Sequence, residues 1–212
     1  MLKQVLLVRH AQSEEDINPN IRDAMQDKEI GITTLGKTQI AGIAKLLYPK
    51  IKRYKKINII TSSSNRAYQT MTLFCSYFQD IDFKITHEEC IRNLNWGNVD
   101  KHSIREVEKE RYRVGVLEFQ FPGGDNTPEF VKKIESLVSI VTDRGRDEKH
   151  AECIIIFTHG FALRVLAKAF LSMNNEEFRH LSNPPNCYVA TLNITNLGNV
   201  LDQPLPKIDF EI

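Results

Sequence analysis

The sequence lacks the features that mark secreted, membrane-spanning or zinc-dependent proteins. Its four cysteines are scattered over 212 residues, with neither the paired spacing of a zinc site nor the density of a disulfide scaffold. No apolar run approaches the ~20 residues that a membrane span requires. The first apolar stretch begins almost at the N-terminus, without the charged region and cleavage site of a signal peptide. We therefore expect a cytoplasmic protein with four reduced thiols: Cys75, Cys90, Cys153 and Cys187.

The chain also lacks an excess of charge of either sign. Its 28 lysines and arginines nearly balance its 27 aspartates and glutamates, so the formal net charge is +1. No general field attracts nucleic acid or an anionic membrane, and we expect neither as a partner, because affinity for anions must come from local groups. Since 42% of the residues are hydrophobic, the chain can bury one sizeable core. We predict a single domain over residues 1–212, and the oligomeric state stays open.

Three apolar runs end in basic or imidazole side chains. The runs at 4–8, 57–61 and 153–157 are rich in β-branched residues and predict buried strands. Each is followed by polar residues: Arg9 and His10, then Arg66 after three serines, then His159 with Gly160. Ligands of open α/β sheets bind at the carboxyl ends of strands. If these strands are neighbours in one parallel sheet, their polar residues converge on one anion site, which shows no carboxylate pattern for a metal.

Helices and strands alternate along the rest of the chain. The patterns predict helices near 35–48, 66–78, 128–144, 161–171 and 174–181, and further strands at 82–86 and 187–194. Thr127 and Pro128 suit the cap and first position of the third of these helices. The alternation predicts an α/β fold, a three-layer α/β/α sandwich around a mostly parallel sheet. Segments 11–31 and 90–125 are too long for tight connections, and we expect the second to form a lid.

Several spaced motifs in this chain resemble one known family. They are Leu7-Val8-Arg9-His10-Ala11-Gln12-Ser13, the Ile32–Gln39 stretch, Ser62-x-x-x-Arg66-Ala67-x-Gln69-Thr70, Thr158-His159-Gly160, and Arg164 five residues later. In this order they resemble the histidine phosphatase superfamily, which has the phosphoglycerate-mutase-like fold. The match spans nearly the whole chain.

A finer resemblance concerns the middle of the chain. Three stretches are similar to the branch related to the broad-range acid phosphatases of yeast and their plant and bacterial relatives. They are Asn95-Trp96-Gly97-Asn98, Glu108-Lys109-Glu110-Arg111-Tyr112 and Phe121-Pro122-Gly123-Gly124-Asp125.

The resemblance implies a chemical role for each strand-end residue. A neutral imidazole attacks a phosphate monoester without the repulsion that an anionic nucleophile meets, so His10 is the candidate nucleophile. Arg9 and Arg66 are suited to bind the equatorial phosphoryl oxygens, where charge sits in a loose transition state. His159, protonated beside the phosphate, and the N–H of Gly160 at a helix start are further donors.

The chain departs from the family pattern at the acid. Ser13 and Asn93 match substrate-binding positions, but the family usually carries a glutamate at the place of Asn93, where it protonates the leaving alkoxide. An amide cannot supply that proton, and general acid catalysis is typically worth ~10²–10⁴-fold. Five other carboxylates are possible substitutes, although each is more simply a solvated loop residue: Asp16, Glu88, Glu89, Asp100 and Asp125.

Three functions remain open from the sequence. The leading hypothesis is a cofactor-free, metal-free phosphohydrolase that acts on a small phosphate ester or a phosphoprotein through phospho-His10. A phosphoglycerate mutase is the second, although such an enzyme needs the acid that Asn93 replaces. The third is a phosphoryl-binding protein with little turnover. For all three we predict that Val8, Thr61 and Phe157 end adjacent strands and that the rings of His10 and His159 face each other within ~10 Å, close enough to bridge one phosphoryl group.

Overall fold

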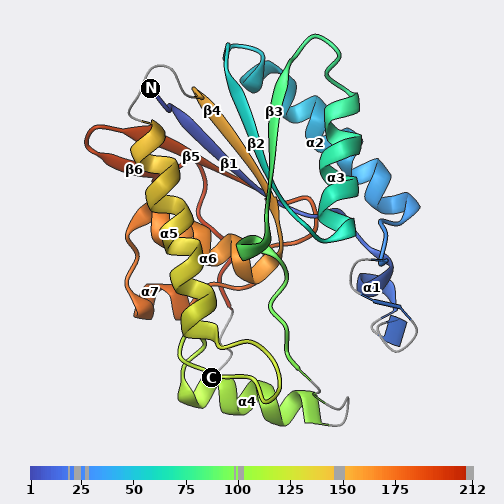
Figure 1. Cartoon of the computed structure of the whole chain (residues 1–212), viewed down its shortest axis with the longest axis vertical. Helices are drawn as coiled ribbons and strands as arrows, with labels where there is room; N and C mark the ends of the chain where they lie inside the picture. The colour runs from blue at the N-terminus through green and yellow to red at the C-terminus, as the bar shows by residue number, and fades with distance from the viewer. Residues whose placement is uncertain are drawn as a thin grey trace.

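The structure is a computed structural model that describes residues 1–18, 20–21, 25–26, 29–97, 99, 103–145 and 151–208. In these residues six strands form a sheet in the order β3-β2-β4-β1-β5-β6 (Figure 1). The strands are β1 (Gln4–Arg9), β2 (Ile57–Ser62), β3 (Phe83–Glu88), β4 (Cys153–Thr158), β5 (Val189–Thr195) and β6 (Gly198–Leu201). The first four are parallel, whereas β5 is antiparallel to β1 and β6 is antiparallel to β5.

The two central strands explain the apolar runs in the sequence. All six residues of β4 and the first five of β1 are buried, because helices cover both faces of the sheet at this point. Parallel strands buried on both faces are near-continuous runs of valine, isoleucine and leucine rather than alternating patterns. Val8 of β1 and Thr61 of β2 both pair with Phe157 of β4. The prediction that these three residues end adjacent strands is therefore confirmed.

Helices cover the two faces of the sheet as separate layers (Figure 1). One face is covered by α2 (Thr34–Ile51) and α3 (Asn65–Ser76), and the other by α5 (Thr127–Gly145) and α6 (Gly160–Leu171), with α7 (Asn175–Arg179) following. Each face has its own core cluster of buried apolar side chains. The predicted three-layer sandwich is confirmed. Within the described part of the chain, no helix combines the length and apolar character that crossing a membrane requires.

Four short elements were not predicted. They are α1 (Glu14–Ile17), the 3-10 helix η2 (Glu89–Ile91), α4 (Ile104–Val114) and β6. The segment 90–125 is thus partly helical rather than a plain loop. Helix α4 was not predicted because it has only a sparse apolar stripe, with charged residues at most other positions.

The start of α5 also differs from the prediction. Thr127 lies inside the helix, as its first residue. The cap is provided by Asn126, whose Oδ1 accepts a hydrogen bond of 3.0 Å from the backbone N–H of Glu129. An asparagine side chain is among the strongest N-cap groups, so the helix begins one residue earlier than a threonine cap would allow.

Candidate active site

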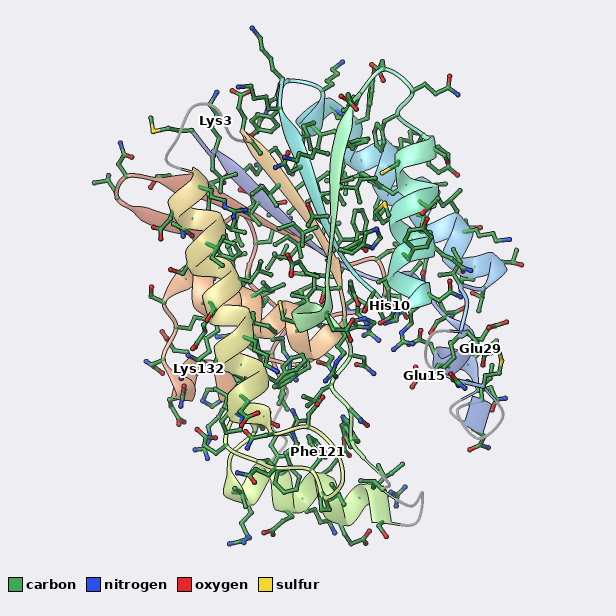
Figure 2. The ribbon with its side chains drawn as sticks, in the orientation of Figure 1. Lys3, His10, Glu15, Glu29, Phe121 and Lys132 are labelled. Carbon is green, nitrogen blue, oxygen red and sulfur yellow. The ribbon has the colours of Figure 1, made fainter. Side chains whose placement is uncertain are left out.

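The two histidines that follow the central strands lie in contact with each other. His10 follows β1 and His159 follows β4, and their ring centroids are 5.0 Å apart with the planes tilted by 55°. Both are buried, with 5% and 1% of their surface exposed. Figure 2 labels His10 at the lower end of the sheet, between Glu15 to the right and Phe121 below. The predicted approach of the two rings is confirmed, because parallel neighbouring strands deliver their following residues to the same edge.

The ring of His10 is held in one tautomer. Its Nδ1 lies 2.9 Å from the carbonyl oxygen of Ala11, and because a carbonyl only accepts, Nδ1 must carry the proton. In the neutral ring the lone pair is then on Nε2. Burial and, after it, the positive charges of Arg66 and Arg9 together lower the pKa of His10 to about 3. His10 is therefore an uncharged imidazole with a basic Nε2 across the ordinary pH range.

Two arginines flank His10, and each is held by a carboxylate. Arg9 donates to Asp16 Oδ1 at 3.2 Å and to the carbonyl of Pro184. Arg66 is 1% exposed and lies 3.4 Å from Glu15 Oε2. Burial lowers the pKa of Arg9, but a guanidinium stays protonated at neutral pH. Both arginines line the cavity that contains His10, where their forks can bind the oxygens of a phosphoryl group.

His159 is fixed by two serines, one at the end of β2 and one just before α3. Its Nε2 lies 3.0 Å from the hydroxyl of Ser62 and 2.9 Å from that of Ser64. His159 is also the N-cap residue of α6, so the helix begins at Gly160, and the first N–H groups of the helix have no carbonyl partner within it. A Cβ at position 160 would lie 2.9 Å from side-chain atoms of Asn183, which explains why glycine is needed there.

Motif residues without a chemical role hold the backbone after His10. The N–H of Ala11 donates to Thr70 Oγ1 at 3.0 Å, and the N–H of Gln12 donates to Gln39 Oε1 at 2.9 Å. Gln69 binds the N–H of Ile32 in the same way. The threonine and glutamines of the sequence motifs therefore position the loop that carries His10.

A cavity of about 530 Å³ surrounds these groups. It is lined by most of the predicted site residues, namely His10, Arg9, Arg66, Asn93 and Gly160. His159 is not among the described lining residues, although its ring contacts that of His10. Ser13 is not among the described lining residues, because its hydroxyl donates to Asp16 Oδ2 at 2.7 Å and closes the first turn of α1. Ser13 thus positions the partner of Arg9. Within the described residues, no cluster of three or more possible ligands is placed to hold a metal ion.

The candidate substitute acids are dispersed. Asp16 lines the cavity, and so does Glu15, which the sequence analysis missed. Burial raises the pKa of Asp16, but hydrogen bonds from Ser13 and nearby positive charge outweigh it and lower the pKa overall. Glu89 accepts from Ser63. Glu88 lines a different cavity, Asp125 is bound by Arg92, and Asp100 lies outside the described residues.

The cavity is lined by two further arginines, Arg111 of α4 and Arg164 of α6. The sequence analysis did not assign either of them to the site. The sequence holds a signal for Arg111. Ile104, Val107 and Val114 form a stripe at helical spacing, and Arg111 occupies the remaining inward position of that stripe. A charged residue at the inward position of an amphipathic helix indicates either a buried ion pair or a binding site.

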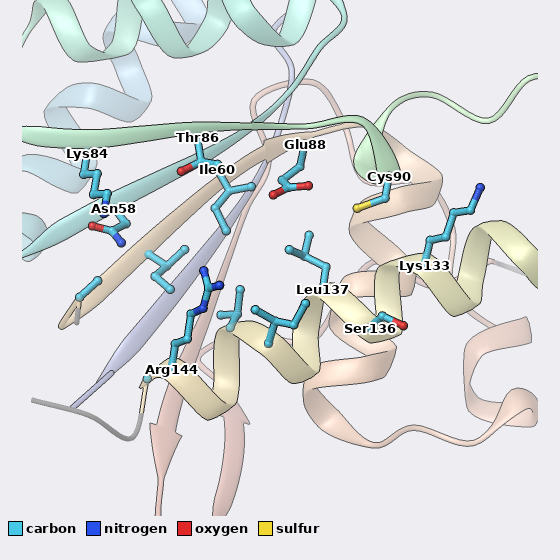
Figure 3. A pocket seen from close by; sticks show the side chains of 15 residues that line it. Asn58, Ile60, Lys84, Thr86, Glu88, Cys90, Lys133, Ser136, Leu137 and Arg144 are labelled. Atoms are coloured by element: carbon cyan, nitrogen blue, oxygen red, sulfur yellow. The ribbon is translucent and has the colours of Figure 1, made fainter. Parts of the chain in front are cut away.

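A second cavity of about 520 Å³ lies on the face of the sheet, between β2, β3 and α5 (Figure 3). Its lining includes Lys84, Lys133, Arg144 and one carboxylate, Glu88. We call it the α5 groove. No histidine is present among the described residues that line it.

Comparison with known proteins gives the family and the fold. Residues 5–204 match the family described as histidine phosphatase superfamily (branch 1). The phosphoglycerate mutase-like proteins AT74 and AT74H of Arabidopsis thaliana are 24% and 23% identical over 93% and 92% of this chain. The chain spans 66% of the length of AT74, just under two thirds, and 75% of the length of AT74H.

Solved structures agree with this family. A mycobacterial glucosyl-3-phosphoglycerate phosphatase superposes with a TM-score of 0.75 at 16% identity, covering 97% of this chain and 100% of that one. The α-ribazole phosphatase of Shigella flexneri gives 0.69 at 16% identity, covering 97% and 96%. These likenesses show the phosphoglycerate-mutase-like fold. Because the family match is to branch 1, the finer resemblance to the broad-range acid phosphatases is not supported.

Proposed function

This chain belongs to branch 1 of the histidine phosphatase superfamily, and we propose that it is a phosphohydrolase that cleaves phosphate monoesters through a phosphohistidine on His10. The observation that carries the proposal is the state of His10. The ring is uncharged, its Nδ1 proton is engaged by Ala11, and its Nε2 lone pair is available in a cavity that two arginines also line.

The proposed reaction has two displacements at phosphorus. Arg9 and Arg66 bind the phosphoryl oxygens while His10 Nε2 attacks, so a P–N bond forms as the bond to the ester oxygen breaks. The leaving oxygen departs as an alcohol or phenol after taking a proton, or as the anion. Water then attacks phosphorus, the P–N bond breaks, and inorganic phosphate and neutral His10 are released. His159 stabilises the negative charge on the phosphoryl group in both steps.

The leaving group limits the range of substrates in this proposal. Asn93 lines the cavity, and it has no acidic proton. Among the described lining residues the carboxylates are Glu15 and Asp16, and both are engaged by arginines. Burial raises the pKa of Asp16, but hydrogen bonds from Ser13 and nearby positive charge lower it overall, so this carboxyl is favoured as the anion. We expect esters with good leaving groups, such as aryl phosphates, to be cleaved much faster than alkyl phosphates.

We further propose that segment 90–125 is the lid of this site. Leu94, Asn95 and Trp96 line the cavity, as does Arg111 farther along the segment. The two ends of the segment are joined at Asp125, which accepts hydrogen bonds from Arg92 and from the N–H of Asn95. This arrangement supports a cover whose base is fixed against α5.

The named structural relatives support a phosphate ester as the substrate. The mycobacterial glucosyl-3-phosphoglycerate phosphatase has been solved with VO3 and with inorganic phosphate. A phosphoryl-binding protein with little turnover is the second candidate function, and the observation that favours it is that Asn93, which lines the cavity, has no acidic proton.

Trapping the intermediate tests the proposal. Wild-type protein mixed with an aryl phosphate and quenched in base should carry one acid-labile, base-stable phosphoramidate on His10. His10→Ala should abolish both the label and the turnover. His87→Ala, which removes an exposed imidazole on β3, is the matched control and should retain both. Turnover that persists in His10→Ala would exclude His10 as the nucleophile, whereas binding without turnover in the wild type would favour the second candidate.

A further inference from the structure

Helix α4 buries an arginine. Of its residues, all of which the structure describes, Arg111 is the one that is buried, with 7% of its surface exposed. The guanidinium carbon lies 4.8 Å from the ring centre of Phe161, 5.5 Å from that of Phe121 and 5.6 Å from that of Trp96. Three aromatic rings from three segments of the chain thus surround one cation.

The hydrogen-bonding capacity of Arg111 is largely unused. Within the part of the chain that the structure describes, its Nε and Nη2 have no hydrogen-bond partner and no carboxylate forms an ion pair with it. Burial lowers the pKa of Arg111, but a guanidinium keeps its proton at neutral pH. The side chain therefore brings a positive charge and several donors into the cavity that it lines.

Arg164 of α6 brings a second charge beside it. Its guanidinium carbon lies 5.3 Å from the centre of the same Phe161 ring, and 5.3 Å from that of Phe178. One of its terminal nitrogens donates to the carbonyl of Leu181 at 2.6 Å. Burial lowers the pKa of Arg164 to about 10, and the charge of Arg111 contributes in the same direction. The two cations are thus close enough to repel each other.

The two pairs of arginines in this cavity differ in their neighbours. Arg9 and Arg66 each form an ion pair with a carboxylate, whereas within the described residues Arg111 and Arg164 contact aromatic faces and one carbonyl. The charge of Glu108 acts on Arg111 without forming an ion pair with it. A buried cation is costly unless it is paired, and stacking on rings compensates only part of that cost. An anion between Arg111 and Arg164 would gain charge-assisted hydrogen bonds and remove their repulsion.

We propose that Arg111 and Arg164 form a second anion subsite, so that the preferred substrate is a phosphate ester with another anionic group on its leaving alcohol or phenol. That group is a carboxylate or a second phosphate, since the planar fork of arginine binds both. The aromatic rings around Arg111 hold its guanidinium in place in the wall of the cavity. This inference rests on the proposed function, because the first anion is the phosphoryl group at His10.

Binding of non-hydrolysable phosphonates tests the subsite without depending on turnover. The probes are 4-(carboxymethyl)phenylphosphonate, its neutral carboxamide analogue of the same shape, and 4-(phosphonomethyl)phenylphosphonate. Wild-type protein should bind the carboxylate or the second phosphonate about 10- to 100-fold more tightly than the carboxamide, as charge-assisted hydrogen bonds predict. The two anionic probes distinguish a carboxylate site from a phosphate site. Titration calorimetry measures the three dissociation constants.

Three variants assign the preference to Arg111. Arg111→Met should reduce the ratio between carboxamide and carboxylate dissociation constants to near one. Arg111→Lys should keep a part of it, because the charge remains but the fork is lost. Arg113→Met, which removes an exposed arginine paired with Glu110 on the same helix, is the matched control and should keep the wild-type ratio.

The inference is overturned if wild-type protein binds the carboxylate and the carboxamide equally, or if Arg111→Met keeps the preference. Should Arg111→Met fail to fold, NMR of the arginine Nε–H groups in the wild type decides. The signal of Arg111 must shift with the carboxylate probe and stay in place with the carboxamide. Failure of the proposed function is a separate result, because it appears as missing turnover and missing phosphohistidine whatever the phosphonates do.

Discussion

The His10 cavity and the α5 groove have nearly equal volumes, about 530 and 520 Å³, and both are lined by cationic side chains. They differ in where those side chains come from. The cavity lies at the carboxyl ends of β1 and β4, where His10 and His159 follow their strands. The groove runs along the faces of β2 and β3, and its lining alternates at positions 58 and 60 and at 84, 86 and 88.

Volume and charge alone therefore do not distinguish the proposed phosphoryl site from the groove. In the groove, strand positions of one face supply part of the lining with a period of two, and Lys84 among them is exposed to water. At the strand ends, the chain leaves the sheet, so backbone N–H groups, imidazoles and buried guanidinium forks can point at one spot. Among its described residues, the groove has no neutral nucleophile surrounded by fixed, desolvated hydrogen-bond donors.

The largest expected effect on activity comes from removing one guanidinium group from the cavity, compared with removing one from the groove. Arg66→Met should lower kcat/KM for an aryl phosphate by about 10³-fold or more, as loss of an arginine that stabilises phosphoryl-transfer charge does. Arg144→Met removes the guanidinium in the groove and should leave kcat/KM unchanged. Steady-state kinetics on both variants measures this. Equal losses in the two variants would erase the functional distinction between the cavities.

The next effect concerns the missing acid. Asn93→Glu should raise turnover of an alkyl phosphate by up to the ~10²–10⁴-fold that general acids provide, and it should change aryl phosphate turnover little. Asn58→Glu, the same substitution in the groove, is the control and should gain nothing on either ester. If wild type already cleaves alkyl esters well and Glu15→Gln or Asp16→Asn cripples it, a carboxylate of α1 has taken over the acid role.

A smaller effect is expected on stability in acid. The folded-state pKa of His10 is lowered to about 3 from an ordinary value near 6.5, so the unfolded chain binds this proton first. The stabilising contribution is complete above pH 6.5 and is lost as the pH falls toward 3. Between pH 7 and 5 the loss amounts to about 2 kcal/mol.

Urea unfolding at the two pH values measures this linkage. His10→Asn should remove about 2 kcal/mol of the acid-induced loss. Lys84→Met in the groove should keep the wild-type loss, because lysines titrate far above this range. An unchanged pH dependence in His10→Asn would mean that the His10 ring is not held neutral.

The site residues that were predicted from the sequence are those whose position follows from their immediate neighbours along the chain. Arg9 and His10 directly follow an apolar strand, and so does His159, and the parallel-sheet rule then brings strand ends together. The parts that were missed depend on contacts between distant segments. Glu15 belongs to the site because it meets Arg66, and Arg111 because α4 packs it against Phe161. A helix with few apolar residues gives a weak periodic signal, so its inward arginine was not recognised.

The smallest expected effect is on KM, from a change at Asp125 in the base of the proposed lid. The proposed lid belongs to the His10 cavity and not to the α5 groove. Burial raises the pKa of Asp125, but the hydrogen bonds from Arg92 and Asn95 outweigh it and keep the carboxyl ionised. Asp125→Asn weakens the paired contact with Arg92, whose two terminal nitrogens lie 2.7 Å from the two carboxylate oxygens.

Because the segment beyond this contact carries lining residues, Asp125→Asn should raise KM for an aryl phosphate about 10-fold, the value of one charge-assisted hydrogen bond, with little change in kcat. Glu110→Gln breaks an exposed pair on α4 with Arg113 and should leave KM unchanged, since such surface pairs contribute little. The split between KM and kcat is decisive. A fall in kcat at constant KM would mean that Asp125 acts on the chemical step, and the segment would not be a lid that governs substrate binding.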